Sequence, residues 1–496
     1  MTSSLPKSEL ILYFTLWTSG VLYSIFNVYS TGRQYYDLNS PGEEFTKGWS
    51  WLGGVLQDRS DYELECWVDF LYILGPWLVI HLSVSLLIEQ ILEEARCLWY
   101  ILVSSLFLCE YTEPALALFV YLQPALFYLL RLSGRKWLTW VASLLFLISM
   151  MYFNTFLTDQ KVPDHKSYML EMAMYWTHLR CLSLSLDKER YSLVQYLAYA
   201  LYLPTLFLGP HITIHHFYGK ADSCPTLSSR LVRFLFELAR CMFWLFVIRL
   251  ALHFIYVNAL QLQIDFVERL SGWSMNGLGY CMGQYFHLKY VVFYGLTTCV
   301  ARCEGLAAPP TPKCVARIHR YSDMWRHFDR GLYLFLTRYL YHPWCSSNQP
   351  SLLRKLSGSL LCFTFIWLWH GPSHPFVLVW SLLNFVGVTV EALSKEIDQM
   401  VTVQRIKGIL SPSNVERVEG LLVTPLTIMS IMSNIYFFGG MEVGNAYVRY
   451  IFKGGWKFTV LFIYSLRHVS VTVQHWELQK QRQLKHQLTK EETNKR

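Results

Sequence analysis

Apolar runs long enough to cross a lipid bilayer recur along almost the whole chain, from Leu10 to Val473. The hydrocarbon core of a bilayer is about 30 Å thick, so a spanning helix needs about 20 mostly apolar residues. No long polar block separates these runs, and only helices or closed barrels satisfy their backbone inside lipid. The sequence therefore predicts an all-α, polytopic transmembrane helical bundle that forms one domain over residues 1–496.

Several predicted membrane segments are shorter than the bilayer is thick, and we expect these to be re-entrant, tilted or packed inside the bundle. The chain should therefore contain about ten to twelve membrane segments, some of them re-entrant. The candidates are Leu10–Val28, Leu71–Ile91, Leu98–Tyr111, Ala115–Leu132, Trp137–Leu157, Tyr196–Leu208, Phe234–Tyr256, Gly277–Val300, Leu352–Trp369, Phe376–Leu393, Leu421–Phe438 and Trp456–Val473.

Two stretches outside these runs have their own composition. Residues 31–65 mix acidic, glycine and aromatic residues, which is typical of an interfacial loop with short helices. Residues 477–496 form a polar tail with six Lys/Arg against three Glu. Short basic segments next to a membrane helix stay on the cytoplasmic side, so we place this tail there.

The overall composition excludes several classes of protein. Charged residues make up 16% of the chain, against about 25% in soluble domains. A net charge of +8 is small for 496 residues and fits contact with anionic membrane lipid, with no nucleic acid as partner. The twelve cysteines contain no CxxC pair, which argues against a disulfide framework or a zinc site.

A histidine at the end of an aromatic run is the first candidate for chemistry. His370 closes the apolar stretch 365–369, and Gly371 and Pro372 then break the helix. A polar group inside apolar helices is costly and is a functional candidate for that reason. Burial favours the neutral, basic form of imidazole, which suits general acid–base work. The alternative is a structural histidine hydrogen-bonded to a neighbouring helix.

The segment 324–331 is the second candidate, because a carboxylate and two arginines stand beside a tryptophan there. On a helix, Trp325 and Asp329 would share one face, as would Arg326 and Arg330. A carboxylate among arginines can equally be a salt-bridged structural group.

A histidine cluster offers a rival interpretation as a di-iron membrane oxidase. His211, His215 and His216 have the HxxxHH spacing of a metal box, and His370 and His374 add a second pair. Imidazoles four residues apart on a helix can hold a metal. No third box exists, and Pro372 interrupts the second pair, so the ligand set falls short of what such enzymes need.

At these positions the chain resembles the membrane-bound O-acyltransferase (MBOAT) family, and within it the Hedgehog acyltransferase branch. The resemblance runs in order from the first apolar run to the last, so it covers nearly the whole chain. The matching stretches are 208–210, 308–314, 324–332, 368–371, 383–391, 433–434 and 439–444.

The resemblance implies a helical bundle around a tunnel through the membrane, with acyl-CoA entering from the cytoplasm and a protein acceptor from the lumen. It implies that palmitoyl passes from palmitoyl-CoA to the N-terminal cysteine of a secreted signalling protein of the Hedgehog type, giving an N-terminal amide. By the same resemblance, His370 and Asp329 are the catalytic residues. Trp325 is a gate, Arg326 a contact for the donor, and Asn434 a polar wall of the substrate site.

The resemblance also implies a haem thiolate ligand at Cys314, for which the alternative is a palmitoylated or idle thiol. The expected location is the endoplasmic reticulum membrane or the Golgi, as a multi-pass protein. A related branch lacks the histidine and is thought not to catalyse transfer. A catalytically silent membrane scaffold of the same fold therefore remains the alternative from a different functional class.

Overall fold

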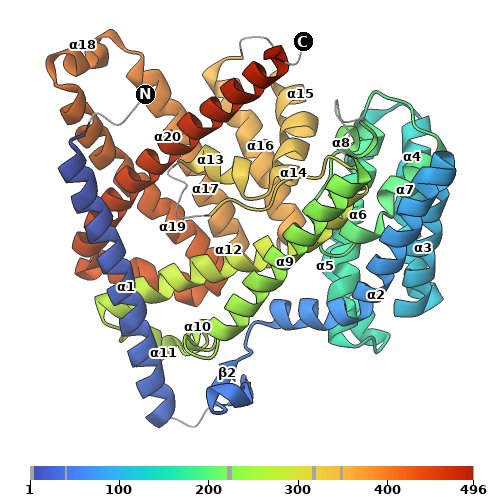
Figure 1. Ribbon diagram of the computed structural model, residues 1–496, viewed down its shortest axis with the longest axis horizontal. Helices are drawn as coiled ribbons and strands as arrows, with labels where there is room; N and C mark the ends of the chain where they lie inside the picture. The colour runs from blue at the N-terminus through green and yellow to red at the C-terminus, as the bar shows by residue number, and fades with distance from the viewer. Residues whose placement is uncertain (1–4, 39–41, 220–225, 315–319, 347–349, 495–496) are drawn as a thin grey trace.

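The computed structural model describes residues 5–38, 42–219, 226–314, 320–346 and 350–494, and it is almost entirely helical. One short antiparallel hairpin is present in this part of the chain, with strands β1 (Phe45–Lys47) and β2 (Leu56–Asp58). The all-α bundle expected from the apolar runs is confirmed (Figure 1).

Long helices supply most of the bundle, and short helices fill its interior and its surfaces. The long helices are α1 (Lys7–Leu38), α2 (Tyr62–Ile91), α3 (Arg96–Tyr111), α4 (Pro114–Leu132), α5 (Lys136–Asp159), α6 (Asp164–Leu186), α9 (Leu227–Ala251), α12 (Gly272–Cys303), α16 (Leu352–His370), α17 (Pro375–Asp398), α19 (Pro412–Tyr450) and α20 (Trp456–Asn494). The short helices are α7 (Leu193–Ala200), α8 (Ile214–Tyr218), α10 (Val257–Gln261), α11 (Ile264–Val267), α13 (Tyr321–His327), α14 (Arg330–Leu336), α15 (His342–Cys345) and α18 (Val401–Ile409).

Single turns of tighter or wider helix complete the chain. The 3₁₀ turns are η1 (Ser50–Leu52), η2 (Glu93–Ala95) and η3 (Leu203–Thr205), and the π-helical turns are η5 (Thr337–Tyr341) and η6 (Ile451–Gly455).

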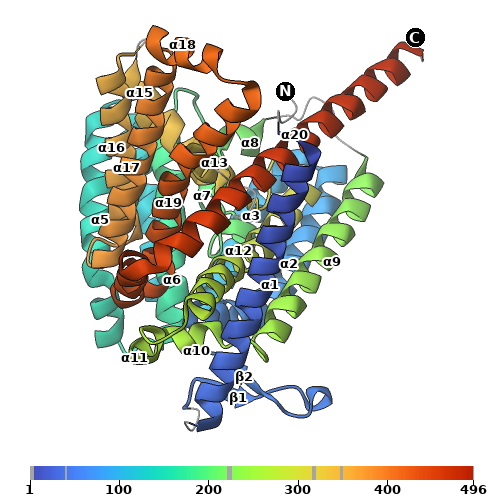
Figure 2. The same ribbon diagram turned by 90° about the vertical axis from the view of Figure 1, so that its left-hand side faces the viewer.

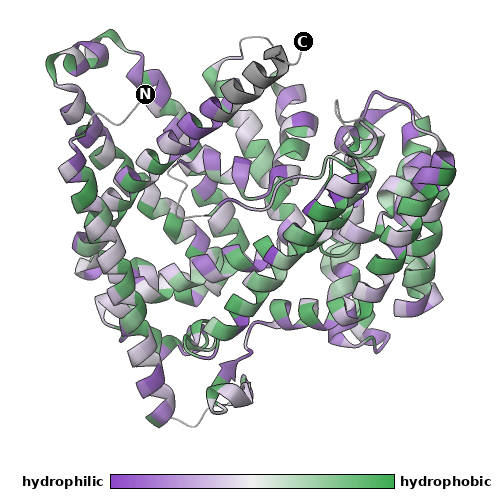
Figure 3. Cartoon of the chain, viewed as in Figure 1, coloured by the Kyte–Doolittle hydropathy of each residue, from purple (hydrophilic) through white to green (hydrophobic). Residues whose placement is uncertain are grey.

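Seven helical segments of the described chain are long and apolar enough to cross a membrane, judged by length and composition. They are α1, α2, α4, α5, α16, α17 and a joined segment over residues 412–483. Large apolar side chains on their outer faces are exposed, such as Phe14 and Leu145, which is the pattern of helices in contact with lipid. Figure 3 shows this apolar colouring along the outer helices. The protein is therefore a multi-pass membrane protein, and the exact number of spans stays a prediction.

One short predicted membrane segment lies inside the bundle, as expected for segments of that length, and one long helix was missed. Residues 196–208 form the end of α7 and the turn η3, both sealed in the interior. The missed helix, α6, contains Glu171, His178 and Arg180, and its polar composition disguised it. Its second half is nevertheless buried, with His178 at 0% and Arg180 at 1% exposure. The side chains of His178 and Arg180 contact polar groups of the protein instead of lipid.

The two stretches outside the apolar runs are also more helical than expected. The predicted interfacial loop 31–65 begins inside α1 and ends inside α2, and it contains η1 and the β1–β2 hairpin. Residues 39–41 of that stretch lie outside the described part. The polar tail from residue 477 continues α20 as a helix to Asn494, and residues 495–496 are again outside it.

Figure 1 shows α2, α3, α4 and α7 at one end of the long axis and α1, α18 and α19 at the other. Helices α9 and α12 pack against each other and run between these groups, and α12 also packs on α1 and α19. The view turned by 90° shows α20 crossing in front of α12 (Figure 2). Helix α12 is therefore the central element, and the functional side chains gather around it.

Candidate functional site

A cavity of about 700 Å³ lies beside α12 and brings together four of the predicted site residues. His370, Asp329, Trp325 and Asn434 all line it, although they come from three separate segments of the chain. We call it the central cavity. Its wall is rich in aromatic side chains, and a group of charged residues described below lines it as well.

His370 is the last residue of α16, and its ring faces the central cavity. The helix ends there because Gly371 adopts a φ of 101°, which side-chain-bearing residues rarely take, and because a proline follows. The ring lies edge-on to Trp380 and to Phe437, with centroids 5.3 Å away in each case. Neither ring nitrogen has a hydrogen-bond partner among the described residues. The imidazole is thus held by packing, with its nitrogens left for a ligand in the cavity.

Asp329 is held more firmly than His370. It caps the N-terminus of α14, where its Oδ1 accepts a hydrogen bond from the Leu332 backbone N–H at 2.9 Å. Its Oδ2 accepts a second hydrogen bond from the hydroxyl of Tyr294 on α12, at 3.1 Å. Side-chain capping of this kind stabilises a helix start by about 1 kcal/mol. The carboxylate is consequently fixed in position and orientation at the cavity wall.

Trp325 is fixed at the same wall by hydrogen bonding and by ring contacts. Its Nε1 donates to Oδ1 of Asn384 on α17, at 3.1 Å. Its ring packs edge-on against Phe363 at 5.1 Å and is tilted against Trp380 at 5.4 Å. Trp380 contacts His370 as well, so one aromatic cluster positions both predicted site residues.

Two of the predicted site residues lie outside the central cavity. Arg326 is 47% exposed and pairs with Asp323 at 3.6 Å, while its guanidinium lies 6.0 Å from the ring of Tyr333. Cys314 contacts Gln284, with its Sγ 3.8 Å from Oε1, and it does not line the central cavity. These surroundings do not identify a haem pocket, and no step of the chemistry below passes through haem.

The histidine cluster does not assemble a metal box. His215 pairs with Asp187, with Nε2 3.0 Å from Oδ2. The Nδ1 of His216 lies 2.7 Å from the hydroxyl of Thr213, and His211 is buried with both ring nitrogens unpaired. Among the described residues, no group of three or more His, Cys, Asp or Glu side chains could hold a metal ion. The di-iron interpretation therefore has no ligand set in this part of the chain.

Asp187 explains the position of His215. Its carboxylate lies 3.3 Å from Arg338 and accepts a hydrogen bond from the hydroxyl of Tyr339 at 2.9 Å. Burial alone would raise the pKa of this carboxyl group. Hydrogen bonds from the Glu189 backbone, Tyr339 and His215 outweigh burial and lower the pKa. Ion pairs and hydrogen bonds of Asp187 therefore connect the end of α6 with α8 and η5.

A buried charge cluster in the central cavity was missed by sequence reasoning. The ammonium of Lys289 on α12 lies 2.6 Å from Asp61 and 2.7 Å from Glu63, both at the start of α2. Tyr168 and Tyr290 donate hydrogen bonds to Glu63 at 2.9 and 3.3 Å. A lysine inside the mostly apolar run 277–300 is the signal that would have found this cluster.

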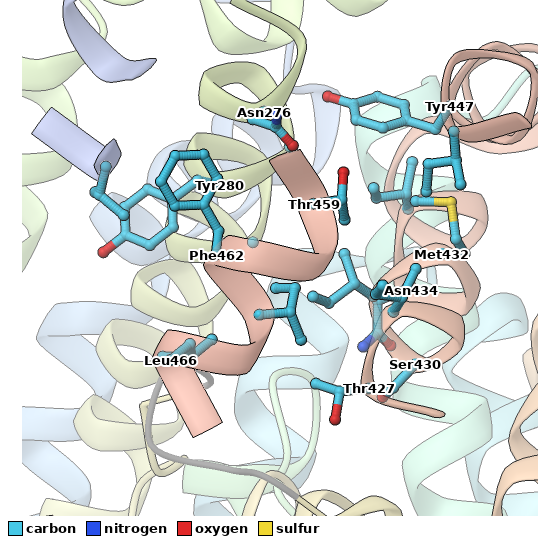
Figure 4. A pocket seen from close by; sticks show the side chains of 18 of the residues that line it. Asn276, Tyr280, Thr427, Ser430, Met432, Asn434, Tyr447, Thr459, Phe462 and Leu466 are labelled. Carbon is cyan, nitrogen blue, oxygen red and sulfur yellow. The ribbon is translucent and has the colours of Figure 1, made fainter. Parts of the chain in front are cut away.

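A second, mostly apolar cavity adjoins the central one. It measures about 200 Å³ and lies between α1, α12, α19 and α20. Met324, Asn434 and Phe438 line both cavities. Figure 4 shows Asn434 and Met432 on one wall, with Tyr280 and Phe462 facing them. We call it the apolar cavity, and Asn434 is the polar residue at its boundary with the central cavity.

Comparison with known proteins relates these features to a family. The model of MBOAT, the membrane-bound O-acyltransferase family, matches residues 122–432. The protein-cysteine N-palmitoyltransferase Rasp of Drosophila melanogaster is 32% identical over 91% of this chain and 92% of its own length. The protein-cysteine N-palmitoyltransferase HHAT of Mus musculus is 28% identical, over 94% of this chain and 98% of its own. The HHAT-like protein of the mouse is 24% identical, over 95% and 94%. The chain therefore belongs to the membrane-bound O-acyltransferase family.

Proposed function

We propose that the protein transfers palmitoyl from palmitoyl-CoA to the N-terminal cysteine of secreted signalling proteins of the Hedgehog type. The product is an amide on the cysteine α-amine. Two relatives named protein-cysteine N-palmitoyltransferase align with more than nine-tenths of this chain. The observation that carries the proposal is the unpaired imidazole of His370 in the same aromatic cavity as the anchored carboxylate of Asp329.

The reaction needs little from the protein beyond orientation and proton transfer. The acyl thioester is already activated, and holding two substrates together can supply several kcal/mol of the barrier reduction. The acceptor nitrogen attacks the thioester carbonyl, the new C–N bond forms, and the C–S bond to CoA breaks. His370 takes the proton that the nitrogen loses and returns it to the leaving thiolate. No oxidant, metal or enzyme nucleophile enters this balance.

Asp329 supports this step from the wall of the same cavity. With Tyr294 and the Leu332 N–H bound to its oxygens, it offers a fixed negative charge to a developing cation or orients the donor head group. Trp325 closes the cavity on the α13 side, and Asn434 forms its polar wall. Arg326, exposed outside the cavity, contacts the phosphates of the donor.

The apolar cavity offers a place for the palmitoyl chain. It borders the central cavity at Asn434, Met324 and Phe438, so a chain lying in it would present its carbonyl to His370. Burying a methylene group gains about 0.8 kcal/mol. The apolar wall therefore favours an acyl chain as its occupant.

An N-terminal cysteine can react by two routes in this site. Its thiol can capture the acyl group first as a thioester, and the neighbouring α-amine, with a pKa of about 7.7 to 8.0, then takes it intramolecularly. Direct attack by the amine needs the same single base. Both routes end at the same amide, and His370 serves either.

The test uses purified full-length protein, palmitoyl-CoA and a synthetic peptide with an N-terminal cysteine. Wild-type protein should form a hydroxylamine-resistant product on the free peptide. A peptide acetylated at its N-terminus is the matched control and should form none. Equal resistant acylation of the blocked peptide would show that the amide assignment is wrong. Failure of both peptides, with palmitoyl-CoA still bound, would favour the catalytically silent scaffold.

Two finer points belong to the same proposal. We place the protein in the endoplasmic reticulum membrane, or the Golgi, where a secreted acceptor passes; immunofluorescence with compartment markers tests this. The haem prediction at Cys314 rests on the resemblance alone. If it is right, purified protein has a Soret absorption band that Cys314→Ser removes, and a wild type without the band ends the prediction.

A further inference from the structure

A third cavity, of about 830 Å³, lies behind the segment that carries Asp329. Arg330, Gly331 and Leu334 of α14 line it, whereas Asp329 and Leu332 line the central cavity. The rest of its wall comes from the segment 211–216, the start of α9, the end of α12 and the segment 305–310. We call it the arginine cavity. Nothing in the proposed transfer reaction uses it.

Positive charge is in excess in the arginine cavity. Four arginines line it: Arg230, Arg233, Arg302 and Arg330. Two carboxylates balance part of this charge. Glu89 pairs with Arg230 at 2.7 Å, and Glu237 pairs with Arg233 at 2.9 Å and with Arg302 at 2.7 Å. Arg330 has no carboxylate partner among the described residues. The wall therefore carries two uncompensated positive charges.

Buried hydrogen-bonding groups without partners lie at the same cavity. Arg230 is only 7% exposed, and its Nε and Nη1 have no hydrogen-bond partner in the described part of the chain. His211 is fully buried, and neither of its ring nitrogens has a partner among the residues that the structure describes. Leaving a polar nitrogen buried without a hydrogen bond costs about 1–3 kcal/mol, and buried polar groups in native structures are mostly hydrogen-bonded. The unpaired N–H groups of Arg230 point to a ligand that accepts hydrogen bonds.

We propose that the arginine cavity binds a phosphate group. Guanidinium groups match phosphate geometry with paired, charge-assisted hydrogen bonds, and a dianion would neutralise the two excess charges. Two sources have this chemistry: the headgroup of an anionic phospholipid and the 3′-phosphorylated nucleotide of a CoA thioester. Exposed Leu231, Val232 and Leu235 stand next to Arg230 and Arg233 on α9. Lipid-facing residues beside the arginines are what a headgroup site requires.

A phosphate bound there would also act on the central cavity. Arg330 directly follows Asp329, and Gly331 packs so closely that an added Cβ would lie 1.8 Å from the backbone oxygen of His211. A ligand held by Arg230 and Arg330 would therefore tie the start of α14 to α9. The start of α14 is the point at which Asp329 is anchored.

The experiment measures ligand-dependent thermal stabilisation of the purified full-length protein in neutral detergent. One arm adds dioctanoyl phosphatidic acid, with dioctanoyl phosphatidylcholine as its control. The other adds CoA, with dephospho-CoA as its control. The variant is Arg230→Gln, and Arg135→Gln, an exposed arginine at the start of α5, is the matched control. Because Arg230→Gln leaves Glu89 unpaired, the double variant Arg230→Gln/Glu89→Gln is measured beside it.

We expect a phosphate probe to stabilise wild type and Arg135→Gln, and to bind at least about tenfold more weakly to both Arg230 variants. Dependence on phosphatidic acid identifies the lipid, and dependence on the 3′-phosphate of CoA identifies the nucleotide. If every probe acts equally on wild type and on the folded Arg230 variants, the proposal is overturned. The readout is binding, so it does not depend on whether palmitoyl transfer is the reaction.

Discussion

The central cavity and the arginine cavity lie on opposite faces of one short helix, α14, and they are built differently. The central cavity has aromatic walls, one unpaired imidazole, one anchored carboxylate and the charge cluster around Lys289. The arginine cavity has several cations, some paired and some not. In the central cavity, His370 and Asp329 each have a separate role, and no neighbouring side chain shares it. In the arginine cavity, neighbouring arginines share one carboxylate, as Arg233 and Arg302 share Glu237. Single substitutions should therefore be severe in the first cavity and graded in the second.

The largest effect should come from His370→Ala. Loss of a general acid–base group typically lowers a rate by about 10² to 10⁴, whereas the ring makes only packing contacts that the fold can spare. Palmitoyl transfer should collapse while the melting temperature in detergent stays near that of wild type. His165→Ala, at an exposed position at the start of α6, is the control. Near wild-type turnover in His370→Ala would remove this residue from the mechanism.

The charge cluster should matter next, and through stability. Lys289→Met leaves Asp61 and Glu63 facing each other without their cation. Breaking a buried ion pair costs about 3–5 kcal/mol. Unfolding in mixtures of SDS and neutral detergent should report this loss. A variant with Asp61→Asn and Glu63→Gln added should recover most of it, and no recovery would contradict the electrostatic explanation.

Two substitutions of Asp329 can separate the effect of its charge from the effect of its position as a helix cap. Asp329→Asn keeps an oxygen for the Leu332 N–H but removes the charge, and transfer should fall by about 10² with stability little changed. Asp329→Ala also removes the helix cap, which should cost a further 1 kcal/mol or so of unfolding free energy. Equal activity of Asp329→Asn and wild type would mean that only the position of the side chain matters.

The smallest effect should be that of Trp325→Phe. The change keeps most of the ring contacts with Phe363 and Trp380 but removes the hydrogen bond to Asn384. Such a bond contributes about 0.5–1.5 kcal/mol, so transfer should fall by a few-fold. Trp137→Phe, on the lipid-facing surface, should change nothing measurable. A complete loss of transfer in Trp325→Phe would contradict this ranking, because transfer would then depend on Trp325 as strongly as on His370.

Sequence reasoning predicted the segments that face lipid correctly, because a helix surrounded by lipid needs a long apolar run. The predicted segments 10–28 and 137–157 lie within α1 and α5. It failed where protein replaces lipid as the surroundings. In α6, Arg180 donates to the backbone oxygen of Ala200 and to Thr205, and His178 lies 2.9 Å from Ser143. Contacts with other helices make that polar helix stable, and hydropathy does not register them.

For the site, too, sequence reasoning identified some residues and missed others. His370 stood out because it ends an apolar aromatic run, and Asp329 because it stands with two arginines beside a tryptophan. The partners of Lys289 could not be predicted, since Asp61 is 228 positions away in the chain. Nor could the outward position of Arg326, because local spacing does not say which face of α13 meets the cavity.

The burial of α6 has a consequence for how the protein is made. An arginine near the middle of a lone helix costs about 2.5–3.5 kcal/mol at the translocon, so α6 would be a poor candidate for insertion by itself. It packs against α4, α5 and α7, and α4 and α5 precede it in synthesis. The translocon would have to retain that pair until α6 emerges and inserts between them. A substitution that weakens α4 or α5 would then appear as failed biogenesis of the whole N-terminal half, well before any acyl group is transferred.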